Sequence, residues 1–230
     1  MCNPAQSRAS ATAGPVLLYY ITDRKQFGGS AADQEQELLE KIGQCADAGV
    51  DYIQLREKDL TTRALEQLAA RAVEAIPGGS ATRLLINSRI DVALACNAHG
   101  VHLPANSLSP SEARAIFARA GKSDPVIGIS THSAHEVASA EAHGADLAVF
   151  GPMFEKAGIA IRDGLIQLAA VTRQSLPVLA VGGITLGKAK QCLEGGASGI
   201  AAIRLFQQGE VEATVNALRR LRVAGTTARG

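Results

Sequence analysis

Residues 177–204 read PVLAVGGITLGKAKQCLEGGASGIAAIR, and this stretch contains one complete strand–helix–strand unit. Two short apolar runs, Val178–Val181 and Gly199–Ile203, enclose a segment with the period of a helix. Near-continuous apolar strands that alternate with helices are typical of a parallel sheet covered by helices. The glycines at 195 and 196 end the helical segment, where glycine adopts a left-handed cap that other residues resist.

The same unit recurs along the whole chain. Strands are predicted over Val16–Thr22, Tyr52–Leu55, Arg83–Ile86, Gly100–Leu103, Val126–Ile129, Leu147–Phe150, Val178–Val181 and Gly199–Ile203. Helices are predicted over Gln34–Ala48, Arg63–Ala75, Pro110–Ala120, Ala134–His143, Gly164–Thr172, Gly187–Leu193 and Glu210–Arg222. An open doubly wound sheet is the alternative fold. Strands of similar length, with no GxGxxG motif after the first, favour a closed (β/α)8 TIM barrel in the α/β class.

Length and composition fit one such domain. The chain has 230 residues and is 47% hydrophobic, which suits one large core rather than two. We expect a disordered N-terminal lead-in over residues 1–14 and a barrel domain over residues 15–225. The net charge of +1 and the 3% aromatic content argue against a nucleic-acid partner. The apolar runs are too short to span a membrane, and a homo-oligomer is compatible with the sequence.

The cysteines indicate a reducing location. Cys45, Cys96 and Cys192 are each expected inside a helical segment, and they lie too far apart for a zinc motif. We interpret them as small buried hydrophobic residues. The first residues contain no apolar signal core, so we expect a cytoplasmic protein.

A phosphate-binding cup is predicted after the last two strands. In a TIM barrel the site lies where the strands end, and Gly182, Gly183, Ile203 and Arg204 stand at the ends of strands seven and eight. Glycine lets the backbone approach a ligand, and the free amides of a helix that begins near Thr185 favour an anion. Arg204 adds a positive charge. A tight turn beside an exposed arginine is the alternative interpretation.

The end of strand two carries a second set of polar residues. If Ile53 and Leu55 face the helices, Gln54 and Arg56 share the side that faces the barrel axis. Arg56 and Lys58 would then be able to neutralise a diphosphate, although a solvated surface run of charges is the alternative.

A histidine follows strand five. His132 is placed to shuttle protons near neutral pH, or else only begins a helix.

Taken together, these segments resemble the thiamine phosphate synthase and thiazole tautomerase superfamily. The matching pieces run in family order: Tyr20–Asp23, Gln54–Lys58, Leu85–Asn87, Asp91–Ala95, Gly100–Leu103, Gly128–Ser133, Gly144–Asp146, Phe150–Phe154 and Val181–Ile184. The synthase joins hydroxymethylpyrimidine diphosphate to a thiazole phosphate and releases diphosphate, a step of vitamin B1 synthesis.

The resemblance implies a role for most of these residues. Gln54, Arg56, Lys58 and Asn87 would bind the diphosphate side, and the cup would bind the thiazole phosphate. Ser130 would touch the reacting pyrimidine. The candidate catalytic residues are Ser130, Lys58 and His132.

Three positions depart from the synthase pattern. Ser88 and Ser107 stand where the family has the two acids that hold Mg²⁺, and neutral hydroxyls are weaker ligands for a hard cation. In the loop after strand six, only Lys156 retains the usual charge.

These departures leave three functions open. The first is a synthase that uses Mg²⁺ at an altered site. The second is a metal-independent tautomerase that relies on His132 and needs no cofactor. The third is a non-catalytic barrel that binds a thiazole or thiamine phosphate. In each case the expected partners are phosphorylated small molecules.

Overall fold

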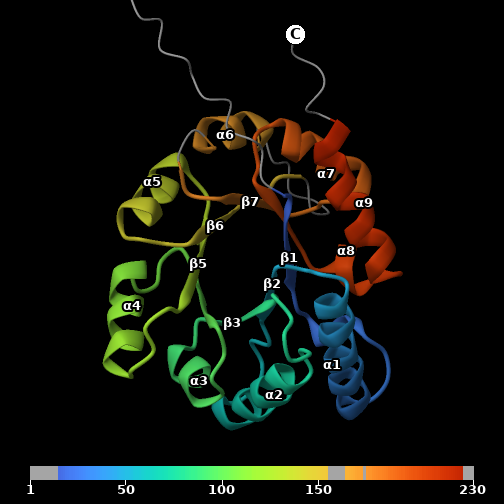
Figure 1. Ribbon diagram of the computed structural model, residues 1–230, viewed down its shortest axis with the longest axis vertical. Helices are drawn as coiled ribbons and strands as arrows, with labels where there is room; N and C mark the ends of the chain where they lie inside the picture. Colours follow the sequence, from blue (N-terminus) through green and yellow to red (C-terminus); the bar gives the residue numbers. More distant parts are fainter. Residues whose placement is uncertain (1–14, 155–163, 173–174, 225–230) are drawn as a thin grey trace, which may run out of the picture.

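The computed structural model describes residues 15–154, 164–172 and 175–224. The predicted lead-in over residues 1–14 and the predicted ligand Lys156 lie outside these ranges. Parallel strands close into a barrel in the order β1 to β8, and the helices surround it (Figure 1). The strands are β1 (Leu17–Ile21), β2 (Tyr52–Leu55), β3 (Arg83–Asn87), β4 (Gly100–Leu103), β5 (Val126–Thr131), β6 (Leu147–Phe150), β7 (Val178–Val181) and β8 (Gly199–Ala202). The predicted TIM barrel is confirmed.

The helices follow the predicted pattern with shifted ends. They are η1 (Arg24–Gln26), α1 (Ala31–Asp47), α2 (Thr62–Glu74), α3 (Ile90–Ala95), α4 (Pro110–Arg119), α5 (Ala134–Ala142), α6 (Gly164–Val171), α7 (Leu186–Glu194), α8 (Arg204–Gln207) and α9 (Val211–Ala224). Helix α1 begins before the predicted Gln34 because Ser30 and Asp33 form a capping box. The Ser30 amide donates to the Asp33 carboxylate at 2.8 Å.

Alternate side chains of each strand serve two separate parts of the core. Tyr19, Leu85, Leu147 and Leu179 belong to a cluster formed only by strand residues and the residues beside them, which fills the barrel. Their neighbours, such as Tyr20, pack outward in the larger cluster that includes the helices. This alternation places Gln54 on the barrel side and Ile53 and Leu55 on the helix side, as predicted.

An aspartate recurs just before a strand at the opposite end of the barrel from the predicted site. The amide of Leu18 donates to Asp51 at 2.6 Å, and the amide of Ile127 donates to Asp146 at 2.6 Å. Each aspartate also pairs with an arginine from a surrounding helix, Arg219 and Arg114 respectively, at 2.9 Å. The segments Gly49-Val50-Asp51 and Gly144-Ala145-Asp146 therefore connect adjacent strands at this end.

Two of the three predicted buried cysteines are buried. Cys45 and Cys192 lie in the helix-packed core, whereas Cys96 follows α3 and is half-buried. Cys96 is the C-cap residue of α3. Among the described residues, no helix is long and apolar enough to cross a membrane.

Candidate functional site

The cup after β7 is built from backbone in a conformation that favours glycine. Gly182 has a φ of +101° and Gly183 a φ of +64°. A Cβ at Gly182 would also lie 2.9 Å from the Cα of Pro152, so packing against the loop after β6 requires glycine as well. Helix α7 then starts at Leu186, and the side chain of Thr185 makes no capping hydrogen bond to its first amides. Those amides point toward the cup, which suits an anion.

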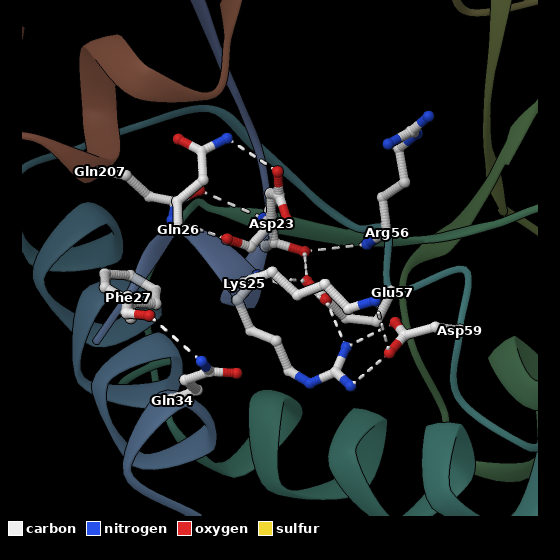
Figure 2. Close-up of polar contacts among 11 residues, drawn as sticks. Asp23, Lys25, Gln26, Phe27, Gln34, Arg56, Glu57, Asp59 and Gln207 are labelled. Carbon is white, nitrogen blue, oxygen red and sulfur yellow. Dashed lines mark hydrogen bonds and ion pairs between the residues drawn. The ribbon is translucent and has the colours of Figure 1, made fainter. Parts of the chain in front are cut away.

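The second wall of the cup is α8, which presents an exposed Arg204 at its first turn next to a half-buried Ile203. A buried glutamine holds this short helix in place. The Asp23 amide donates to Gln207 Oε1 at 3.1 Å, and Gln207 Nε2 donates to the Asp23 carbonyl at 2.9 Å (Figure 2). Gln207 was not predicted, because its partner is 184 residues away in the sequence.

The opening of the barrel at the C-terminal ends of its strands is called the mouth here. The cup forms one half of this mouth, and the end of β2 forms the other half. Gln54 is buried, and its Nε2 donates to Asn87 Oδ1 at 2.8 Å, so these two predicted residues meet. The backbone amide of Arg56 donates to Thr22 Oγ1 at 2.9 Å. The side chain of Arg56 points away from Glu57 and Asp59 (Figure 2). The guanidinium therefore stays available to a ligand.

Lys58 and Asn87 line one cavity of about 330 Å³ between the loops after β2 and β3. Ser88 and Arg89 line the same cavity. Lys58 is exposed, and Arg89 is held by Asp91 through a hydrogen bond of 2.8 Å. Lys58 thus supplies the cavity with a cation, while the Glu57 carboxylate that lines the same cavity is paired with Arg24.

Glu57 lies between Arg56 and Lys58 in the sequence and was given no role by the sequence analysis. In the structure it holds Thr22 and Arg24. Thr22 Oγ1 donates to Glu57 Oε1 at 2.6 Å, and Arg24 Nη1 donates to Oε2 at 2.9 Å. Arg24 also binds Asp59 at 2.7 Å and holds the pKa of that carboxyl well below its ordinary range. Burial raises the pKa of the Glu57 carboxyl, and the bonds from Thr22 and Arg24 oppose that rise. The alternative interpretation of this run as solvated surface charge therefore does not hold for Glu57, which is buried.

The residues at Asp23 and Arg24 connect the two halves of the mouth. Asp23 is fixed to α8 by Gln207, and Arg24 is fixed to the end of β2 by Glu57 (Figure 2). The spacing between the cup and Arg56 is thereby set by one short segment that is bound on both sides.

Ser130 and His132 stand at the end of β5 in different surroundings. Ser130 is half-buried, and its Oγ lies 2.9 Å from Nε2 of the buried His102. His132 is exposed, and its Nδ1 lies 2.6 Å from the carbonyl oxygen of Gly151. Since a carbonyl only accepts, Nδ1 of His132 carries the hydrogen and Nε2 remains free to accept one. Both ring nitrogens of the buried His102 have a hydrogen-bonding partner, Tyr19 at Nδ1 and Ser130 at Nε2.

The residues in place of the family's acids do not form a magnesium site. Ser88 and Ser107 line different cavities, so their hydroxyls do not converge. The Asn87 carbonyl oxygen is already bound by Gln54. Within residues 15–154, 164–172 and 175–224, no cluster of three histidine, cysteine or acidic residues is placed to hold a metal. Mg²⁺ prefers carboxylate oxygens, but the carboxylates of Glu57, Asp59 and Asp91 at this edge are already bound by Arg24 or Arg89.

The fold and this mouth define a class: a TIM-barrel enzyme that binds phosphorylated small molecules at the strand ends. A family model described as thiamine monophosphate synthase matches residues 18–206. The chain belongs to the thiamine monophosphate synthase family.

Individual relatives agree with the family model. A thiamine-phosphate synthase from Halalkalibacterium halodurans is 40% identical over 190 residues, which cover 81% of this chain and 85% of the relative. One from Clostridium novyi is 37% identical over 190 residues, covering 81% and 88%. The structure of a thiamine phosphate pyrophosphorylase from Pyrococcus furiosus superimposes with a TM-score of 0.74 at 27% identity, covering 92% of this chain and 97% of that one.

Proposed function

We propose that this protein is a thiamine-phosphate synthase that couples hydroxymethylpyrimidine diphosphate to a thiazole phosphate and releases diphosphate. One observation carries the proposal within the family. The mouth has two separate ends whose donors and cations suit an anion, and residues 22–24 are hydrogen-bonded to both. A reaction that joins two phosphorylated substrates needs two such ends.

The thiazole phosphate belongs in the cup. Gly182 and Gly183 offer backbone amides, and Arg204 offers a fixed positive charge that is not bound by a described carboxylate. An anion in this place neutralises the end of the α7 dipole. The cup thus orients the thiazole ring toward the barrel axis.

The diphosphate belongs at the end of β2. Breaking the carbon–oxygen bond leaves a pyrimidine cation and a diphosphate with an additional negative charge. Arg56 and Lys58 stabilise that charge, and Ser130 contacts the same substrate at the far side of the mouth. The thiazole nitrogen then captures the cation, which completes the carbon–nitrogen bond. Lys156, which lies outside the described residues, would add a further cation from the loop after β6.

Because Ser88 and Ser107 do not fit Mg²⁺, we assign the leaving-group charge to protein cations alone. The Arg56 guanidinium forms paired hydrogen bonds to phosphate oxygens, and Lys58 acts as a point charge. We infer that the family's metal requirement is reduced in this chain.

A coupling assay with both substrates tests the proposed activity. We expect thiamine phosphate and diphosphate to form in equal amounts. No product at high enzyme concentration would overturn the proposal. If the protein instead isomerised a thiazole phosphate carboxylate, with loss of that activity in His132→Ala, the tautomerase assignment would replace it. Tight binding of thiazole phosphate without either coupling or isomerisation would show that the protein is a non-catalytic binding barrel.

A further inference from the structure

Three polar side chains form a chain through the barrel interior beneath the mouth. The Tyr19 hydroxyl lies 2.8 Å from His102 Nδ1, and His102 Nε2 lies 2.9 Å from Ser130 Oγ. Tyr19 and His102 are almost completely buried, whereas Ser130 is only half-buried at the end of β5. The chain therefore runs from a dry interior to the surface that a substrate contacts.

The hydrogens of this chain have two possible neutral arrangements. In the first, Tyr19 donates to Nδ1, and Nε2–H donates to Ser130, whose own hydrogen is left over. In the second, Ser130 donates to Nε2, and Nδ1–H donates to Tyr19, whose hydrogen then has no acceptor. No other hydrogen bond of the Tyr19 hydroxyl to a described residue is present.

The first arrangement is strongly favoured. An unpartnered buried hydroxyl hydrogen disfavours the second by roughly five- to a hundredfold. A protonated His102 is excluded near neutral pH, because burial and the nearby Arg56 lower its pKa to about 3. His102 is therefore neutral and carries its hydrogen on Nε2.

We propose that Tyr19 and His102 are positioning residues that fix Ser130 as a hydrogen-bond donor to the pyrimidine diphosphate. Because His102 occupies one lone pair of the Ser130 oxygen, the hydroxyl hydrogen is directed into the mouth. The substrate atom that meets Ser130 is then an acceptor, either a ring nitrogen or an oxygen of the diphosphate. The identity of this ligand rests on the proposed function, whereas the direction of the chain does not.

Nitrogen NMR of the histidine-labelled protein tests the direction without any substrate. We expect the His102 ring, assigned by its response to Ser130→Ala, to show a protonated Nε2 and an unprotonated Nδ1. In Tyr19→Phe, which removes the donor to Nδ1, we expect this single-tautomer pattern to be lost. A protonated Nδ1 in the unaltered protein, or a pattern unchanged in Tyr19→Phe, would overturn the proposal, whether or not the protein is a synthase.

Tyr20 supplies a matched control from the adjacent position of β1. Its hydroxyl is buried on the helix side of the strand, where no described residue forms a hydrogen bond with it. Tyr20→Phe should change kcat/KM by less than about twofold, and Tyr19→Phe should lower it by about tenfold. In a Ser130→Ala background, Tyr19→Phe should lower it by less than about twofold, since the group it positions is gone. Equal losses in both backgrounds would show a purely structural role and would contradict the proposal.

Discussion

The two ends of the mouth present different kinds of groups to a ligand, mainly backbone at one end and side chains at the other. The cup after β7 and β8 consists mainly of backbone, held by glycines that packing itself requires. The end of β2 consists of side chains, namely Gln54, Arg56 and Lys58. Backbone cannot be exchanged one atom at a time, whereas a side chain changes with a single substitution. This difference is consistent with the family resemblance, by which Gly182 and Gly183 match the pattern whereas Ser88 and Ser107 stand in place of two acids.

Substitution in the backbone-built end should have the largest effect. Gly182→Ala places a methyl group 2.9 Å from Pro152 at a φ of +101°, so the loop must move. We expect kcat/KM to fall by about a hundredfold, because a shift of an ångström disrupts substrate alignment. Gly187→Ala in α7 is the control, since nothing lies within 4 Å of its Cβ. Similar activity losses in the two variants would refute this account of the cup.

The segment Asp23–Arg24 joins the two ends of the mouth, and we expect its anchoring to depend on Glu57. Glu57→Gln removes a buried charge from the side of Arg24, and we expect about 2 kcal/mol less free energy of unfolding. Asp59→Asn affects a more exposed partner of the same arginine, so the loss should be under about 1 kcal/mol. Urea unfolding measures both values. A larger loss of unfolding free energy for Asp59→Asn than for Glu57→Gln would show that Asp59, and not Glu57, anchors Arg24.

The ends should respond separately in kinetics. Arg204→Met should raise the KM for the thiazole phosphate by about tenfold, because it removes a charge-assisted contact. It should leave the KM for the pyrimidine diphosphate nearly unchanged. Arg56→Met should act in the reverse sense. If either variant altered both KM values alike, the two ends would not be independent.

The last effect concerns acid stability and appears only below neutral pH. Burial lowers the pKa of His102 from about 6.5 to about 3, so the unfolded chain binds a proton between these values and the folded chain does not. The free energy of unfolding should therefore fall as the pH decreases through this window, by at most about 1.4 kcal/mol per pH unit from this group. Unfolding curves measured in the wild type and in His102→Gln test this. An equal slope in both proteins would contradict the assignment.

The sequence predicted the barrel because its strands are buried apolar runs that can be recognised locally. It placed Gln54 and Ile53 on the correct sides for the same reason, since side chains alternate along a strand. It did not reveal the partners of Glu57, Gln207 or His102. Those contacts join residues 33, 184 and 83 positions apart, and no local pattern records them.

The central claim is that protein cations replace carboxylate-held metal at the diphosphate end. The initial rate of thiamine phosphate formation, measured from excess chelator up to millimolar free Mg²⁺, tests it most directly. We predict clear product formation in chelator and a rise of less than about tenfold with Mg²⁺. A rate that is absent in chelator and rises more than about a hundredfold with Mg²⁺ would contradict the claim.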